Sequence, residues 1–253
     1  MANSTYTFDG IISSGTGYFQ KDSTFSASVR RMQTKLNRLG FPCGTADGIF
    51  GKDTDTQLRA FQKKYNLTPD GKAGQNTLSK LDSLSPDSTT EKYGRELTHS
   101  DWKGGYSTSS ISETESLART IYGEDSTHST GQAAVAKELY NRKKSTRNFG
   151  NYASSNPKSW KGIVFSKSQY AVVTGTETDT GNARHPNQYS SEWENCVDLA
   201  TKLVKGKVPS STLGNQCYHL SSNSSYPATS VASTRIQIPS SGGNKFFDYQ
   251  TAL

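Results

Sequence analysis

The residue best placed to do chemistry in this sequence is a single carboxylate, Glu124. Residues 112–115 read Ser-Glu-Thr-Glu, a hydroxyl three positions ahead of a carboxylate, and apolar residues from Leu117 to Ile121 follow at the spacing of one helix face. This pattern predicts a helix that ends at Gly123, which places Glu124 at the negative end of the helix dipole. Such a position disfavours the carboxylate and favours the protonated form, which a general acid needs near neutral pH. The simpler interpretation is that Glu124 only solvates a turn.

Two further helices are expected to surround this residue. Residues 131–142 read Gly-Gln-Ala-Ala-Val-Ala-Lys-Glu-Leu-Tyr-Asn-Arg, with Ser129 or Thr130 as the N-cap, and the alanines allow another backbone to approach closely. Another amphipathic helix is predicted between Tyr189 and Val204. Its apolar stripe, expected to be core, is Trp193, Val197, Ala200 and Leu203.

Residues 121–124 (Ile-Tyr-Gly-Glu) and the helix at 131–142 together resemble the SleB-type spore cortex-lytic cell-wall hydrolases. The resemblance continues more weakly downstream and covers residues 111–253, with gaps; the segments that carry it are 162–170, 216–219 and 234–247. In that family the Glu of the Gly-Glu pair is the sole catalytic carboxylate. The resemblance therefore implies that Glu124 is the catalytic residue.

The same resemblance implies a cleft for a glycan substrate. Four side chains could stack on or hydrogen-bond to sugar rings there, although each aromatic could equally belong to the core: Tyr122, Gln169, Tyr170 and Tyr218. No metal and no cofactor is expected at this site. One departure from the family lies beside the acid, because Asp125 follows Glu124 where the family often has Ala, and Asp125 could share the site.

The reaction that the resemblance implies is that of a lytic transglycosylase. One acid is sufficient for it, since Glu124 would protonate the glycosidic oxygen and then take the proton from the C6 hydroxyl of the same muramoyl residue, giving a 1,6-anhydro end. Glycosidases commonly use two carboxylates, so the first alternative is a muramidase-type hydrolase that uses Glu138 or Asp179 with water.

Two alternatives belong to other classes of protein. A zinc amidase centre would have to be built from His128, His185, His219 and Cys217, which lack the short helical His spacings of common catalytic zinc sites. A cysteine peptidase based on Cys217 and His219 is disfavoured, because alternate residues of a strand face opposite ways. The last alternative is a non-catalytic wall-binding protein, for which the N-terminal part of the chain would be enough.

The N-terminal part contains an internal repeat. Residues 47–54 read Asp-Gly-Ile-Phe-Gly-Lys-Asp-Thr and recur at 70–77 as Asp-Gly-Lys-Ala-Gly-Gln-Asn-Thr, each copy being a turn followed by a helix start that the Thr or its neighbour could cap. Three short helices are predicted from their apolar faces: Val29, Met32, Leu36 and Leu39; Leu58, Phe61 and Tyr65; Leu78, Leu81 and Leu84. This pattern resembles the three-helix peptidoglycan-binding domain over residues 23–84, and the resemblance implies a groove near the loop at 47–50.

These patterns predict two domains and a linker. A peptidoglycan-binding domain is expected at residues 1–84, a linker rich in Ser, Thr, Pro and Gly at 85–110, and a SleB-like catalytic domain at 111–253. Trp102 and Tyr106 in the linker are expected to pack against the catalytic domain. The predicted fold class is α+β: a three-helix bundle joined to a lysozyme-like or lytic-transglycosylase-like domain with helices and a small antiparallel sheet.

Composition narrows the choice of partners. The chain has 253 residues and a net charge of +7 without any block of like charge, a diffuse positive field that suits a polyanionic surface such as the bacterial wall. No nucleic-acid motif and no membrane-spanning run is present, so peptidoglycan is the expected partner and a monomer the expected state.

The ends and the cysteines add two expectations. Residues 1–20 lack a basic start and an apolar core, so we expect a protein made in the cytosol, either a phage endolysin released by a membrane-permeabilising protein or a processed spore enzyme. Three cysteines do not suggest a disulfide framework, and the one conceivable bridge joins Cys196 to Cys217.

Overall fold

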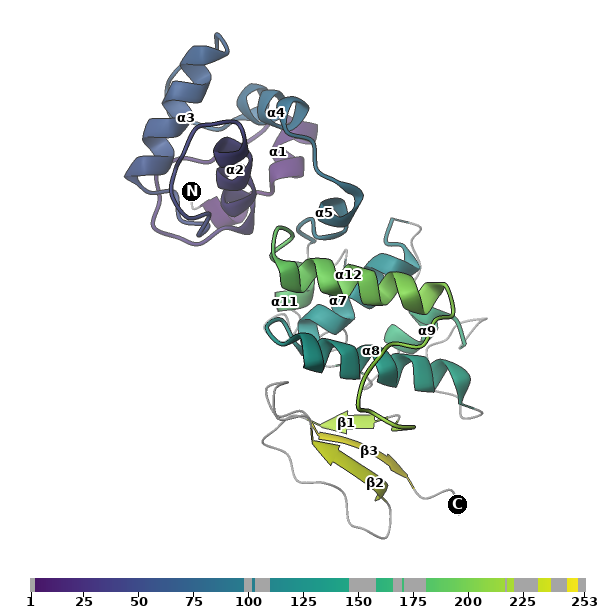
Figure 1. Ribbon diagram of the computed structural model, residues 1–253. Coiled ribbons are helices and arrows are strands. Elements are labelled where there is room, and N and C mark those ends of the chain that lie inside the picture. The colour runs from purple at the N-terminus through teal and green to yellow at the C-terminus, as the bar shows by residue number, and fades with distance from the viewer. Residues whose placement is uncertain are drawn as a thin grey trace. The chain divides into compact units, whose positions relative to one another are not determined.

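The computed structural model shows two compact units, residues 1–92 and 93–253 (Figure 1). It describes residues 3–97, 102, 110–145, 158–165, 170, 181–216, 218–220, 232–237 and 245–249, and for the last three ranges only the backbone. Among these residues no helix is both long and apolar enough to cross a membrane.

Unit 1, residues 1–92, is a bundle of short helices. After the 3₁₀ turn η1 (Asn3–Thr5), its helices are α1 (Phe8–Ser14), α2 (Ala27–Arg38), α3 (Lys52–Lys64), α4 (Gln75–Leu84) and α5 (Thr89–Tyr93), the last of which crosses the boundary. The three predicted helices are confirmed as α2, α3 and α4. Their apolar faces enclose one core together with side chains of α1 and the connecting loops, including Phe8, Ile11, Phe19, Val29, Met32, Leu36, Phe50, Leu58, Phe61, Leu78 and Leu81.

Buried charges hold the chain after α4 against α2. The Lys35 ammonium is fully buried and donates to the Ser85 carbonyl at 2.5 Å and to Asp87 Oδ1 at 2.6 Å. Arg31 adds a bond to Asp87 Oδ2 at 2.8 Å. Because a buried ammonium needs such partners, residues 85–87 are part of unit 1 rather than a free connection.

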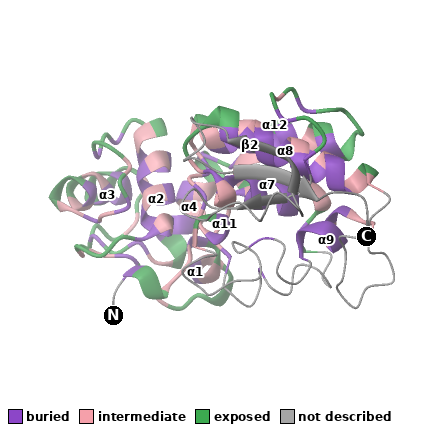
Figure 2. Ribbon diagram, turned by 90° about the horizontal axis from the view of Figure 1, so that it is seen from below, coloured by how far each residue is buried: buried purple, intermediate pink, exposed green. Residues whose placement is uncertain are grey.

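Unit 2, residues 93–253, is built around one central helix. The helix α7 (Glu113–Glu124) is packed by α8 (Ser129–Lys144), α9 (Trp160–Val164), α11 (Gly181–Arg184) and α12 (Ser191–Val204). Most residues of α7 and α8 are buried, whereas α12 has one buried and one exposed face (Figure 2). The predicted stripe of α12 is core, and Trp102 is fully buried with its ring centre 5.0 Å from that of Phe165. Tyr106 lies outside the described residues.

The predicted α+β fold class is wrong, because the described structure is overwhelmingly helical. Strand structure is limited to β1 (Tyr218–Leu220), β2 (Ala232–Gln237) and β3 (Lys245–Tyr249), paired antiparallel in the order β1-β3-β2. The described buried residues of both cores lie on helices and the loops between them. The expected sheet came from the family resemblance of residues 216–219 and 234–247, whereas helices and the loops between them bury the described cores.

Candidate functional site

Glu124 is the last residue of α7, one position beyond the predicted end of the helix. Its side chain is half-buried, and the next residue, Asp125, ends the helix by donating its N–H to the Ile121 carbonyl at 3.0 Å. At the other end of α7, Ser112 accepts from the N–H of Glu115 at 3.1 Å, as the capping pattern predicts. The capped start of α7 therefore lies about three helical turns before Glu124.

The turn after Glu124 is organised by the Asp125 carboxylate. Its Oδ1 accepts from the N–H of Thr127 at 3.1 Å and of His128 at 2.9 Å, and lies 3.2 Å from His128 Nδ1. The side chain is only 3% exposed, and its Oδ2 has no hydrogen-bond partner among the described residues. Asp125 thus satisfies two backbone donors of the turn that precedes α8, while its other oxygen is buried one residue after Glu124.

Gln132 ties the same turn to α12. Its Nε2 donates to the Asp125 carbonyl at 3.0 Å, and its Oε1 accepts from Asn195 Nδ2 at 2.6 Å. Gln132 is completely buried, so these two bonds satisfy amide groups that would be costly to leave unpaired. The glutamine of the small-residue helix therefore positions the backbone beside Glu124, a role that the sequence analysis did not assign.

A buried ion-pair network anchors α7 itself. Glu115 Oε1 accepts from Arg119 Nε at 3.0 Å and from Arg95 Nη1 at 2.7 Å. Burial lowers the pKa of Arg119 to about 10, opposed by the negative charge of Glu115, so this guanidinium remains a cation at neutral pH. It also donates to the carbonyls of Ala183 and Arg95, at 2.8 and 2.6 Å, which fixes α7 against neighbouring segments.

The structure places the other predicted substrate-binding residues in different environments. Tyr122 is 7% exposed, its hydroxyl accepts from the Asn187 N–H at 3.2 Å and its ring meets Trp193 edge-on at 5.6 Å. Tyr170 is fully buried beneath the Arg142 guanidinium, 4.6 Å from the ring centre. Gln169 and the side chain of Tyr218 lie outside the described residues. The cleft role of these four residues remains a prediction.

Of the two proposed second carboxylates, Glu138 is engaged inside the core. It is fully buried, and its Oε1 accepts from Arg142 Nη2 at 2.5 Å. The face of α8 that carries Glu138 therefore packs inside the unit. Asp179 lies outside the described residues.

The residues of the zinc and cysteine alternatives do not form a group that could hold a metal within the described part of the chain. His128 pairs with Asp125, and His185 Nδ1 lies 3.6 Å from Glu96 Oε1. Cys196 is a free, buried thiol whose pKa is raised by burial, so the one conceivable bridge is not formed. Cys217 and the side chain of His219 lie outside the described residues.

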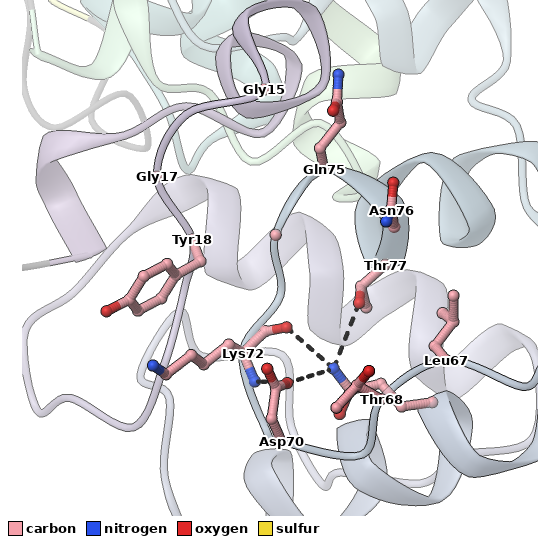
Figure 3. A pocket seen from close by; sticks show the side chains of 12 residues that line it. Gly15, Gly17, Tyr18, Leu67, Thr68, Asp70, Lys72, Gln75, Asn76 and Thr77 are labelled. Atoms are coloured by element: carbon pink, nitrogen blue, oxygen red, sulfur yellow. Dashed lines mark hydrogen bonds between the residues drawn. The ribbon is translucent and has the colours of Figure 1, made fainter.

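Unit 1 carries a pocket of about 380 Å³ at the second copy of the repeat (Figure 3). It is lined by Gly15, Gly17, Tyr18, Gln62, Leu67, Thr68, Asp70, Lys72, Gly74, Gln75, Asn76 and Thr77. The groove expected near residues 47–50 thus has its described counterpart one repeat later, at residues 70–77.

Each repeat is centred on a buried glutamine that the sequence analysis did not single out. Gln62 Nε2 donates to Asp70 Oδ1, the Lys72 carbonyl and Thr77 Oγ1 at 3.0, 2.9 and 3.3 Å, while its Oε1 accepts from the Gly71 N–H at 3.0 Å. Gln33 makes the corresponding four bonds in the first copy, to Asp47, Gly48, Ile49 and Thr54. The repeated Thr residues therefore serve this network and do not cap the helices, whose N-caps are Gly51 and Gly74.

Comparison with known proteins supports both halves of this description. Residues 26–81 match the family described as putative peptidoglycan binding domain. A spore cortex-lytic enzyme of Bacillus cereus is 30% identical over 164 residues, which cover 57% of this chain and 59% of that protein. A spore cortex-lytic enzyme of Oceanobacillus iheyensis is 45% identical over 53 residues, 21% of this chain and 19% of that one.

A shorter match involves a different enzyme. The N-acetylmuramoyl-L-alanine amidase CwlM of Mycobacterium tuberculosis is 39% identical over 61 residues, 24% of this chain but only 15% of that protein. The chain spans 59% of the length of the Bacillus cereus relative, and the matched 57% of the chain exceeds residues 1–92, so that similarity includes part of unit 2. Residues 26–81 therefore match the peptidoglycan-binding domain family, and the chain is similar to spore cortex-lytic enzymes, which confirms the resemblance read from its sequence.

Proposed function

We propose that this protein degrades peptidoglycan at the bacterial wall, with Glu124 of unit 2 as the catalytic acid and unit 1 as the wall-binding part. The observation that carries this proposal is the similarity to a spore cortex-lytic enzyme that extends past unit 1. The position of Glu124 also supports the proposal. Glu124 lies at the C-terminal end of the central helix, next to a turn that hydrogen bonds of Asp125 and Gln132 hold in place. A rigid support is what a proton-transferring side chain needs.

The proposed reaction is a lytic transglycosylation that uses one carboxyl group twice. Protonated Glu124 gives its proton to the glycosidic oxygen as the bond from that oxygen to C1 of the muramoyl residue breaks. The resulting carboxylate accepts the proton of the C6 hydroxyl, and the C6 oxygen bonds to C1. The glycan ends in a 1,6-anhydro ring, no water is consumed, and Glu124 is again protonated.

A hydrolytic reaction is the second candidate, and Asp125 gives it a specific basis. The Oδ2 atom of Asp125 is buried and has no hydrogen-bond partner among the described residues, directly after the proposed acid. A second carboxylate of this kind could activate water. Glu138 is less suited to that role, since its carboxylate is paired with Arg142 in the core.

Mass spectrometry of fragments released from purified walls tests both candidates. Transglycosylation predicts glycan ends lighter by one water than the ends that a hydrolase releases. Reducing ends without anhydro rings would overturn the transglycosylase proposal and favour water activation beside Glu124. Peptide-bond products with intact glycan strands would overturn glycosidase activity itself.

A further inference from the structure

The two repeats of unit 1 share a hydrogen-bond network but differ in what they expose. Position 49 after the first Asp-Gly turn is Ile, whereas the corresponding position 72 is an exposed lysine. The first turn of α3 contains Asp53 and Asp55, whereas that of α4 has no acidic residue. The described pocket lies at the second copy, where the lysine is present and the first turn of the following helix, α4, has no acidic residue.

Lys72 is the cation of the pocket lining. Its ammonium lies beside the ring of Tyr18, 4.7 Å from the ring centre, and makes no ion pair among the described residues (Figure 3). The one carboxylate of the lining, Asp70, uses Oδ1 inside the loop, accepting from Gln62 and from the Lys72 N–H at 2.9 Å. Lys72 therefore brings a positive charge to the Tyr18 side of the pocket, while Oδ1 of Asp70 is used within the loop that forms the wall.

Polar donors complete the lining beside Lys72. Asn76 and Thr77 belong to the first turn of α4, where backbone N–H groups have no partner inside the helix and where Gly74 supplies no side-chain cap. The amide of Gln75 donates to the Ile12 carbonyl at 2.8 Å and so holds the rim formed by α1. An acceptor placed between Lys72 and this turn would meet a charge and hydrogen-bond donors together.

The same lining is poorly suited to stacking on sugar rings. Tyr18 is its one aromatic side chain, and the ammonium of Lys72 lies over that ring. The lining instead contains the amide of Asn76 and the hydroxyl of Thr68, polar groups that can pair with a peptide backbone.

We propose that this pocket of unit 1 binds the peptide stem of peptidoglycan through a free carboxylate, held by Lys72 and the first turn of α4, rather than the glycan strand. The inference rests on the proposed function, in which unit 1 is the wall-binding part. The negative charge of Asp70 weakens the binding of a small anion such as acetate. The bound carboxylate must therefore belong to a peptide that makes additional hydrogen bonds with the pocket.

The test is a titration of the full chain, followed by amide shifts in nuclear magnetic resonance. The probes are diacetyl-Lys-D-Ala-D-Ala with a free C-terminal carboxylate, the same peptide with a C-terminal amide, N-acetylglucosamine tetramer, and acetate. We expect the free-acid peptide alone to shift the resonances of Asn76 and Thr77, and Lys72→Gln to weaken its binding about tenfold through loss of one charge-assisted bond. Lys52→Gln, an exposed lysine of α3 outside the lining, should leave binding unchanged.

Three results would contradict binding of a peptide carboxylate in this pocket. Equal binding of the amidated peptide, or shifts at these residues caused by the sugar tetramer instead, would overturn the inference, as would a Lys72→Gln variant of unaltered melting temperature that binds like the parent. Sedimentation with purified walls separates this failure from failure of the proposed function. If the parent chain pellets with walls but the peptide does not bind, only the carboxylate inference falls; if the chain stays in the supernatant, the wall-binding function falls.

Discussion

At the scale of single residues, the chemistry depends on one half-buried carboxyl group and its immediate neighbour. Glu124 ends a helix, and Asp125 uses one oxygen to hold the following turn. The two adjacent acids therefore differ in role: Glu124 is the proposed catalytic acid, and Asp125 holds the turn that follows it. Substitutions should separate them.

Glu124→Gln should abolish wall degradation while fold and wall binding persist. The amide keeps the size of the side chain but cannot transfer a proton, and one general acid-base group contributes a factor of about 10² to 10⁴. Because Glu124 is proposed to act in both steps, the loss should reach the upper end. The measurement is the rate of turbidity loss of purified walls.

The control for this substitution is Glu194→Gln on the exposed side of α12, which should keep the parent rate. Glu138→Gln is unsuitable as a control, because it leaves the buried Arg142 without its carboxylate. A Glu124→Gln protein that retains a tenth of the parent rate at unchanged melting temperature would show that Glu124 is not the acid.

The buried thiol of Cys43 should make unit 1 less stable in alkali. Burial raises the pKa of Cys43 from 9.0 to about 11. Between these values the unfolded chain releases the thiol proton more readily than the folded one. The contribution of Cys43 to the free energy of unfolding is therefore complete below pH 9 and is lost as the pH rises towards 11. The loss should amount to at most about 3 kcal/mol. Denaturant unfolding of the parent and of Cys43→Ala between pH 8 and 11 measures it, and parallel curves for the two proteins would contradict it.

At the scale of elements, three glutamines and one aspartate hold the turns that present the sites. Gln33 and Gln62 repeat one network in the two copies of unit 1, and Gln132 and Asp125 shape the turn between α7 and α8. In each case a buried polar side chain satisfies backbone groups of a turn, so the turn geometry depends on a residue from a helix.

Gln62→Ala should damage the pocket, whereas Gln33→Ala should not. Each substitution leaves several buried groups unpaired and should lower the free energy of unfolding by about 1–3 kcal/mol. Only the Gln62 network, however, shapes the loop that carries Asp70 and Lys72. Wall sedimentation at matched folded fraction should therefore weaken for Gln62→Ala alone, and equal loss in both variants would contradict a site at the second copy.

Asp125→Ala should destabilise the start of α8. The substitution removes the acceptor of two backbone N–H groups, which for comparable caps costs about 1–2 kcal/mol. Asp125→Asn should recover most of this loss, because its side-chain oxygen can still accept. Thermal unfolding of the three proteins makes the comparison, and an alanine variant as stable as the parent would show that the turn is held elsewhere.

At the scale of the whole molecule, the division into two units follows buried charge rather than sequence composition. Lys35 bonds to Ser85 and Asp87, and the Arg38 guanidinium is paired with Glu91 in α5, so these residues belong to the compact unit 1–92. The predicted borders of a linker at 85–110 remain a prediction that limited proteolysis can check.

A fragment of residues 1–92 should fold and sediment with walls, and a fragment of residues 1–84 should be markedly less stable. The shorter piece leaves the fully buried Lys35 without two of its partners, and breaking a buried ion pair costs about 3–5 kcal/mol. Urea unfolding of the two fragments gives the difference. Equal stability would mean that Asp82 alone, 3.0 Å from the ammonium, satisfies Lys35.

The sequence by itself determined the local features of this protein. The helices α2, α3, α4, α7 and α12 follow from apolar periodicity, the repeat from its Asp-Gly turns, and the wall-related identity from short motifs, because each depends on residues close together in the chain. Tertiary structure alone decided which groups meet. Packing between distant segments produces the Gln62 network, the burial of Glu138, the pairing of Lys35 with Asp87 and the helical rather than α+β character. The pattern of apolar residues along the chain predicts which helix face is buried. It does not show which polar side chain will be enclosed with which partner.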